Sequence, residues 1–232
     1  MLVLCNGMPR SASTWAYNVV LALLRQTAVG EIHSGYDDNL DRFLRGVPAA
    51  ASHAVAKSHF LDPTAVAISQ LGAAKVVYTW RPLPDAIASY MVMFGVDFEG
   101  AIDVMSKAID VYCHHRRCGS LVLRYQDITA EPAPAVRKIA AHLQLKASEA
   151  QISAIAEATS LASMRAKAEE IASPGYCLKL NRHDGLSYDP ETMLHVNHIR
   201  NGDYDYGRKM LRLDQLQKLR RLLVEKGALE CG

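Results

Sequence analysis

Short apolar runs rich in β-branched and aromatic residues alternate along the chain with stretches of helical period. The runs fall at residues 2–5, 54–57, 75–80 and 121–125. Each is followed by a stretch with helical period. Continuous apolar strands that alternate with helices indicate a parallel sheet, covered on both faces and joined by right-handed crossovers. The predicted fold class is therefore α/β, with a central parallel sheet flanked by helices.

The helical pattern predicts helices at roughly residues 14–26, 83–93, 98–113, 133–143, 148–171 with a break, and 213–226. Two stretches, 30–50 and 173–208, show no regular pattern. Long irregular segments over an α/β sheet are often lids or binding loops. The chain contains no repeat or convincing linker, so one domain over residues 1–232 is expected.

Composition and charge restrict the class of protein. Half of the 232 residues are hydrophobic, enough for one full core. The net charge of +2 predicts neither a nucleic-acid nor a membrane partner, so an anion site must be local. Five cysteines without regular spacing and no apolar run long enough for a signal peptide or membrane span favour a cytoplasmic location. No oligomeric state is predicted.

The first strand runs directly into a loop, Asn6 to Trp15, and then into a helix, which is the layout of a phosphate-binding strand, loop and helix start. Arg10 offers a fixed positive fork for an oxyanion. The remaining loop residues are small or carry hydroxyls, so that the backbone can approach a phosphate. They are Ser11, Ala12, Ser13 and Thr14.

The loop departs from that of nucleoside triphosphatases. Against the pattern G-x-x-x-x-G-K-[ST], Gly7 and Thr14 match, but Ala12 stands at the second glycine and Ser13 at the lysine. Without the lysine that neutralises β- and γ-phosphates, the loop is better matched to a smaller anionic group. A plain capped helix after a turn is the alternative, because Ser and Thr are common N-cap residues.

A second anion-binding segment follows the strand at 75–80. Arg81 comes at the carboxyl end of this strand, the edge at which open parallel sheets bind ligands, and Ser89 lies in the next helix. Pro82 and Pro84 can start that helix without losing a needed amide bond. Taken singly, Arg81 could be a surface ion pair and Ser89 an exposed residue. Together they could reach one phosphate.

These two segments resemble the nucleotide motifs of sulfotransferases that use 3′-phosphoadenosine 5′-phosphosulfate (PAPS). PRSASTW is similar to the 5′-phosphosulfate loop P-[KR]-S-G-[ST]-T-[WL], with Ala12 in place of glycine. The segment from Arg81 to Ser89 is similar to the 3′-phosphate motif R-x-P-x-D-x-x-x-S-[YF] and keeps its spacing of eight. The resemblance implies PAPS as co-substrate, bound by Arg10, Ser11, Ala12, Ser13, Thr14, Trp15, Arg81 and Ser89.

Two weaker similarities extend the predicted nucleotide site. Residues 121–128 resemble the family strand L-x-[LV]-x-Y-E-D-L, which makes Tyr125 either an adenine contact or an aromatic residue packed on the core. Arg200, Asn201 and Gly202 resemble the family element R-K-G, with Asn201 in place of lysine. A solvated loop is the alternative for these three residues.

Catalysis is predicted from the end of the second apolar run. Ala56-Lys57-Ser58-His59 resembles the family segment K-[TS]-H, which implies that His59 is the general base and that Lys57 reaches the sulfuryl oxygens or the acceptor. Two residues apart on an extended chain, both side chains can point to one face. The resemblance also places Arg10 on the bridging oxygen. No carboxylate cluster calls for magnesium, so a metal-independent in-line transfer is predicted.

The sequence thus predicts sulfuryl transfer from PAPS to a hydroxyl or amine of a small-molecule or carbohydrate acceptor. The rival functions are a P-loop kinase of a small metabolite and a non-catalytic nucleotide-binding module. Acceptor choice is expected to lie in the loops at 30–50, 91–97 and 173–197. Within the first loop, Tyr36, Asp37 and Asp38 either recognise the acceptor or form a solvated turn.

Overall fold

The computed structural model describes residues 1–173, 175–180, 186–195, 199 and 205–232. Within these residues, five strands form one parallel sheet in the order β2-β3-β1-β4-β5. The strands are β1 Leu2–Gly7, β2 Glu31–Tyr36, β3 Ala51–Ser58, β4 Lys75–Trp80 and β5 Leu121–Arg124. The predicted α/β class with a central parallel sheet is confirmed.

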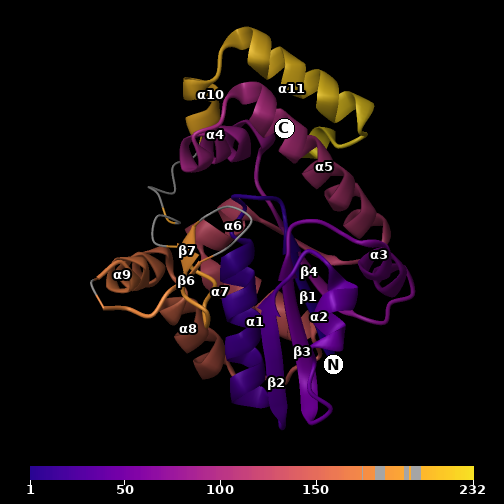
Figure 1. The fold of residues 1–232 in the computed structure, drawn as a ribbon, viewed down its shortest axis with the longest axis vertical. Helices are drawn as coiled ribbons and strands as arrows, with labels where there is room; N and C mark the ends of the chain where they lie inside the picture. The colour runs from indigo at the N-terminus through magenta and orange to yellow at the C-terminus, as the bar shows by residue number, and fades with distance from the viewer. Residues whose placement is uncertain (174, 181–185, 196–198, 200–204) are drawn as a thin grey trace.

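The chain order places helices on both faces of the sheet (Figure 1). From β1 the chain moves to β2 at one edge, and from β3 it crosses β1 to reach β4 on the other side. Right-handed crossovers in opposite directions put the connecting helices α1 (Ser13–Thr27) and α3 (Pro63–Gln70) on opposite faces. A crevice therefore opens at the carboxyl ends of β1 and β3, the usual ligand site of such sheets.

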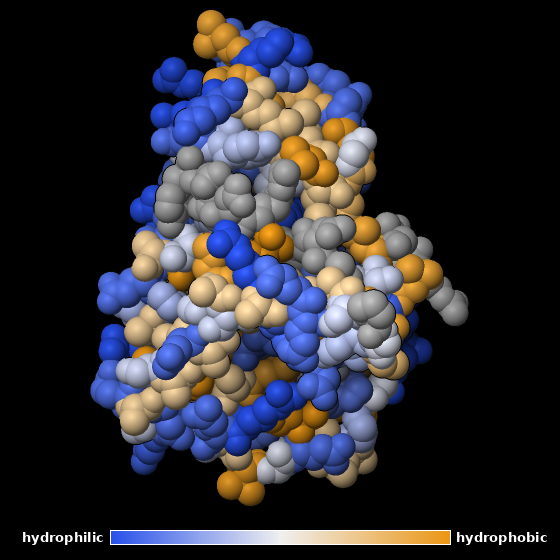
Figure 2. All heavy atoms as spheres, turned by 90° about the vertical axis from the view of Figure 1, so that its left-hand side faces the viewer, coloured by the Kyte–Doolittle hydropathy of each residue, from blue (hydrophilic) through white to orange (hydrophobic). Residues whose placement is uncertain are grey.

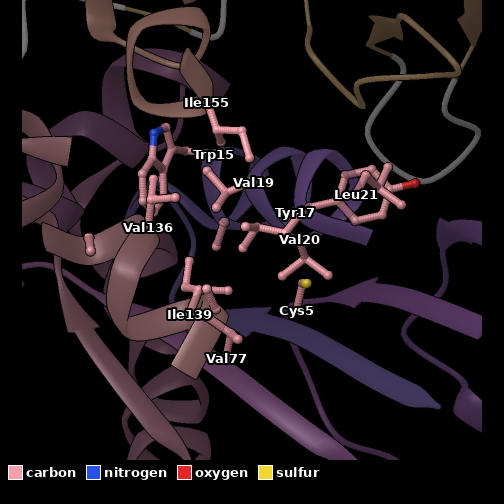
Figure 3. Close-up of a cluster of buried hydrophobic side chains, with 14 of the residues drawn as sticks. Cys5, Trp15, Tyr17, Val19, Val20, Leu21, Val77, Val136, Ile139 and Ile155 are labelled. Carbon is pink, nitrogen blue, oxygen red and sulfur yellow. The ribbon is translucent and has the colours of Figure 1, made fainter. Parts of the chain in front are cut away.

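The helix α1 packs against one face of the sheet. Its side chains Val19 and Val20 are fully buried and share a core with Cys5, Val77 and the helices α7 (Pro132–His142) and α8 (Glu149–Ala158). Figure 3 shows this layer, with α1 side chains pointing to the sheet and to Val136 and Ile155. Because α1 is held on both sides, the loop at its start has a rigid base.

The opposite face carries the helices that connect β2 to β3, β3 to β4 and β4 to β5. Helix α2 (Leu40–Arg45) and α3 cover β3 and β1, whereas α4 (Leu83–Phe94) and α5 (Phe98–Arg117) cover β4. Two helices of the C-terminal part, α10 (Tyr206–Met210) and α11 (Leu213–Glu225), pack on α4 and α5 in the upper part of Figure 1. The helices α6 (Tyr125–Ala130) and α9 (Leu161–Ile171) and the 3₁₀ turn Leu229–Cys231 complete the described helical elements.

The structure differs from the sequence expectation in the stretch 30–50, which forms β2 and α2 rather than an irregular loop. As an edge strand, β2 is only half buried, and its sequence EIHSGY has neither the apolar run nor the strict alternation that marks a strand. In the second irregular stretch, β6 (Lys179–Leu180) and β7 (Ser187–Tyr188) form a short antiparallel pair. Tyr125 begins α6 rather than ending a strand.

The face in Figure 2 interleaves hydrophilic and hydrophobic residues. In the described part of the chain, no helix combines the length and the apolar character needed to cross a membrane. The prediction of one domain over the whole chain remains a prediction.

Candidate active site

The loop between β1 and α1 ends in a helix N-terminus that lacks a side-chain cap. The N-cap residue Ala12 has φ 70° and ψ 29°, makes no cap hydrogen bond, and no acidic residue follows in the first turn. Arg10 also has a left-handed backbone, with φ 68°. The hydroxyl Oγ1 of Thr14 is buried and has no hydrogen-bond partner among the described residues. Amides and a hydroxyl in this arrangement suit a bound anion.

Ser11 holds this loop to the neighbouring strand. Its amide donates to the Met8 carbonyl at 3.2 Å, and its hydroxyl lies 2.6 Å from that carbonyl and 2.8 Å from the Thr79 carbonyl at the end of β4. Ser11 is fully buried. The amide and the hydroxyl of Ser11 therefore both bond within the protein. Ser11 thus determines the shape of the loop.

Gly7 permits the close approach of β1, β4 and α1 at this point. A Cβ on Gly7 would lie 2.3 Å from Thr79 Oγ1 and 2.9 Å from Ser13 Cβ. Real Cβ atoms do not make contacts this short, so any larger residue would push the loop away from β4. The glycine at the start of the predicted phosphate loop therefore has a packing role.

The two predicted nucleotide motifs meet in space. Arg10 Nε donates to Ser89 Oγ at 3.0 Å, which joins the loop after β1 to the middle of α4. Arg81, at the end of β4, is 6% exposed, and its guanidinium carbon lies 4.2 Å from the centre of the Tyr125 ring. Stacking of this kind lowers the cost of burying a guanidinium. Tyr125 thus contacts Arg81, an arrangement that sequence reasoning did not foresee.

Asp85 of the second motif fixes the start of α4 to the C-terminal helices. Its Oδ1 accepts from the Gly207 amide at 2.7 Å, and a Cβ on Gly207 would lie 2.1 Å from the Pro84 carbonyl carbon. A cavity of about 290 Å³ opens beside this contact, with Pro82, Pro84, Asp85, Gln126, Asp205, Arg208 and Gly232 in its lining. The cavity lies at the start of α4.

Lys57 and His59 come to the crevice between β1 and β3. Lys57 is 4% exposed and lies on the face of the sheet that α1 covers, with Nζ 4.9 Å from the centre of the Tyr36 ring. His59 follows the end of β3, and its Nδ1 lies 2.7 Å from the Gly7 carbonyl oxygen. Because a carbonyl only accepts, Nδ1 carries the proton, and Nε2 of the neutral ring carries the lone pair.

The surroundings of His59 keep its ring neutral. Burial and the charge of Lys57 lower the pKa of His59 to about 4, against the opposing effects of the Gly7 carbonyl and Asp38. His195 also lowers this pKa, so the chain just after β7 comes close to the crevice, although no motif in the sequence marks His195. At neutral pH, His59 can accept a proton on Nε2 without first losing one.

Asp38 was considered from the sequence only as an acceptor contact or a turn residue, and its contact with the backbone at His59 was missed. Its Oδ1 accepts from the amides of His59 at 2.7 Å and Phe60 at 3.2 Å, and its Oδ2 accepts from the Tyr36 hydroxyl at 2.6 Å. Its neighbour Asp37 instead pairs with Arg42 on the surface. A pair of acids in a Tyr-Asp-Asp-Asn turn gave no sign that only the second would face the site.

The remaining predicted residues divide into two groups. Trp15 lies in the core beside Val136 and Ile155 (Figure 3), and its indole Nε1 is buried without a partner among the described residues. Arg200, Asn201 and Gly202 lie outside the residues that the structure describes.

The electrostatics of the crevice favour an anionic ligand. Lys57 and Arg81 are buried at the carboxyl edge of the sheet, and Arg10, in the loop after β1, is partly buried and contacts Ser89. Positive groups held in a partly desolvated cleft attract anions more strongly than surface charges do. Among the described residues, no group of three or more His, Cys, Asp or Glu side chains could hold a metal ion.

Comparison with known proteins gives the family. A family model described as "Sulfotransferase domain" matches residues 3–174, which include the loop after β1, Lys57 and His59, and the segment from Arg81 to Ser89. The chain belongs to the sulfotransferase family. It is therefore a sulfuryl-transfer enzyme, and the resemblance seen in its motifs is confirmed. No curated protein matches the sequence.

Solved structures share the sulfotransferase fold. A mouse sulfotransferase, SULT7A1, complexed with PAP has a TM-score of 0.68 and 17% identity, over 97% of this chain and 83% of that one. Retinol dehydratase in a complex with retinol and PAP has a TM-score of 0.66 and 15% identity, over 97% and 80%. The same enzyme with androsterone and the inactive cofactor PAP gives 0.66 and 16%, also over 97% and 80%. At these identities the likeness shows the fold.

Proposed function

We propose that this sulfotransferase moves a sulfuryl group from PAPS to a hydroxyl or amine, with His59 as the general base. The observation that carries the proposal is the 2.7 Å contact between His59 Nδ1 and the Gly7 carbonyl, since it leaves the Nε2 lone pair for the acceptor proton. A pKa of about 4 keeps that lone pair available throughout the physiological range. Structural neighbours with PAP bound support the choice of nucleotide.

The described residues fit such a nucleotide. The uncapped start of α1 and the unpartnered Thr14 hydroxyl suit the 5′-phosphate, with the amides of Ala12, Ser13 and Thr14 as donors. Arg81 and Ser89 suit the 3′-phosphate. The buried indole N–H of Trp15 and the Tyr125 ring suit the adenine. Arg200, Asn201 and Gly202 remain proposed contacts on the evidence of sequence alone.

The chemistry is assigned to three side chains. PAPS supplies an activated sulfuryl group, joined to its 5′-phosphate through a bridging oxygen. His59 Nε2 takes the proton from the acceptor hydroxyl as the new oxygen–sulfur bond forms. Lys57 balances charge on the sulfuryl oxygens, and Arg10 balances charge on the bridging oxygen as its bond to sulfur breaks. Positioning and positive charge supply most of the rate, and we propose that no metal takes part.

The acceptor is proposed to be a small molecule with a hydroxyl or amine that can reach His59 Nε2. Retinol and androsterone, which the retinol dehydratase structures contain, are the first compounds to test. Tyr36 and His195 lie near His59, and the chain around these two residues is proposed to select among acceptors.

The testing experiment transfers labelled sulfate from PAPS to retinol, androsterone, a phenol, a monosaccharide and an aliphatic amine. With whichever acceptor reacts, His59→Ala is expected to lower kcat about 10²- to 10⁴-fold, the usual contribution of a general base. Affinity for adenosine 3′,5′-bisphosphate is expected to stay within a few-fold, because His59 contacts the acceptor. His53→Ala is the control, since His53 lies at the other end of the same strand.

Wild-type kcat in His59→Ala would contradict the assignment of the base. Nucleotide binding without transfer to any acceptor would favour a non-catalytic nucleotide-binding module. Tighter binding of ATP with magnesium than of adenosine 3′,5′-bisphosphate would favour a kinase-like site.

A further inference from the structure

The carboxylate of Asp38 contacts the backbone of the proposed base and lies two residues beyond the end of the edge strand β2. Both of its oxygens are used: Oδ1 accepts from the backbone amides of His59 at 2.7 Å and Phe60 at 3.2 Å, and Oδ2 accepts from the Tyr36 hydroxyl at 2.6 Å. A carboxylate that accepts several N–H and O–H groups is held in one orientation. The chain direction just beyond β3 is thus fixed by a side chain from the turn that follows β2.

The end of β2 also lies beside Lys57, which is proposed to act with His59 in catalysis. Tyr36 pairs with Lys57 in the sheet register, and the Asp37 amide donates to the Lys57 carbonyl at 3.0 Å. The Tyr36 ring lies 4.9 Å from Lys57 Nζ and 6.0 Å, centre to centre, from the His59 ring. Tyr36 therefore lies beside both Lys57 and His59, and its hydroxyl joins it to Asp38.

We propose that Asp38, supported by Tyr36, is a positioning residue that holds His59 in the Nδ1–H tautomer with its ring turned toward the Gly7 carbonyl. The His59 ring can reach this carbonyl only if the backbone at residues 59 and 60 stays in place, and Asp38 holds both amides. The consequence for catalysis rests on the proposed role of His59, whereas the tautomer itself does not.

The contacts of Asp38 give it a role beside the two that the sequence suggested, acceptor recognition and a solvated turn. Three donors, the two amides and the Tyr36 hydroxyl, lie 2.6–3.2 Å from its oxygens. Because they come from the protein itself, they orient the carboxylate without a substrate.

The experiment measures the His59 tautomer directly in the nucleotide-free protein. In ¹⁵N-histidine-labelled protein at pH 7, the wild type is expected to show one protonated and one bare ring nitrogen for His59, with the proton on Nδ1. Asp38→Ala is expected to shift both signals toward averaged values, as the two tautomers exchange. Asp38→Asn keeps an acceptor oxygen for the two amides and is expected to restore most of the wild-type pattern.

Asp62→Ala is the matched control. Asp62 lies three residues after His59 in the sequence. It also accepts from two backbone amides, those of Ala65 at 2.7 Å and Asp41 at 3.3 Å. Its loss removes the same type of contact without touching the amides of His59 and Phe60. The His59 signals are therefore expected to match those of the wild type.

Activity provides the second measurement. Asp38→Ala is expected to lower kcat about 10- to 100-fold, the cost of a catalytic group misplaced by roughly 1 Å. Nucleotide affinity is expected to stay within about twofold. Should Asp38→Ala fail to fold, Tyr36→Phe removes only the hydroxyl that holds Oδ2 and is expected to change the signals in the same direction, by less.

A wild-type tautomer pattern in folded Asp38→Ala, or in Tyr36→Phe if the former does not fold, would overturn the inference. So would an equal disturbance in Asp62→Ala. If Asp38→Ala disturbs the tautomer but His59→Ala keeps wild-type kcat, positioning stands and the proposed base fails. The two hypotheses are thus tested separately.

Discussion

The helices α1 and α3 each follow a strand of the sheet, β1 and β3, but their N-termini are built in opposite ways. Asp62 caps α3 by accepting from the Ala65 amide at 2.7 Å, and a proline occupies the first turn. Ala12 has a left-handed backbone and leaves α1 without a side-chain cap, and the nearby Thr14 hydroxyl has no partner in the described part of the chain. A capped start stabilises the fold, whereas an uncapped start keeps its donors for a ligand.

The strongest test of this contrast gives α1 the acidic cap residue that α3 already has. In Ala12→Asp a carboxylate would occupy the place proposed for the 5′-phosphate. Affinity for adenosine 3′,5′-bisphosphate is expected to fall at least about 100-fold, because like charges brought together cost several kcal/mol. Isothermal titration calorimetry measures this affinity. Ala12→Asn has nearly the same shape without the charge, and an equal loss there would mean that size and not charge closes the site.

The second prediction separates the two phosphate subsites. Arg81→Ala is expected to weaken binding of adenosine 3′,5′-bisphosphate about 30-fold, or about 2 kcal/mol, through loss of a charged partner. Binding of adenosine 5′-monophosphate, which has no 3′-phosphate, should change little. Arg124→Ala is the control, because Arg124 ends the next strand and also lies over an aromatic ring but is exposed. Equal losses for both nucleotides would contradict the assignment of Arg81.

The capped helix should respond in stability alone. Asp62→Ala is expected to lower the free energy of unfolding by about 1 kcal/mol, the usual cost of losing an N-cap. Urea denaturation measures this change. Nucleotide affinity should equal that of the wild type, and a tenfold weaker value would show that α3 also contributes to the ligand site.

The smallest effect is expected from Ala12→Gly. At φ 70° an alanine is strained and a glycine is not, so the substitution should raise the free energy of unfolding by up to about 1 kcal/mol. Thermal denaturation measures the change, and nucleotide affinity should be retained. A lower melting temperature would mean that this backbone conformation costs the alanine nothing.

Sequence patterns predicted most of the sheet, and the two segments expected to share one nucleotide do lie together, although their contacts with a nucleotide remain a prediction. Buried strands such as β1 and β4 are continuous apolar runs, and Arg10 and Ser89 do form a hydrogen bond. The edge strand β2 was not predicted, because its half-buried residues are mostly polar. Asp38 was not predicted as a neighbour of His59 either. The pairing of β2 with β3 brings the two residues together, and that pairing could not be expected while β2 was not recognised as a strand.

The backbone conformation of the loop after β1 and the burial of its side chains could not be predicted from the sequence either. The left-handed backbone at Arg10 and Ala12 is determined by how the loop fits between Thr79 and α1, since neither residue type favours it. The burial of Trp15 follows from the packing of α1 against α7 and α8. Motif spacing predicts which residues serve one ligand, whereas tertiary packing decides which atoms of those residues remain available.

The hydrogen bond between Arg10 and Ser89 spans 79 residues of chain, and the proposed nucleotide contacts come from the ends of several strands. An unfolded or partly folded chain cannot bring these groups together, so the nucleotide should bind the native state alone. At 100 times its dissociation constant, it would then stabilise that state by about 2.7 kcal/mol. A cell that keeps this nucleotide abundant would in this way also protect the protein from proteolysis.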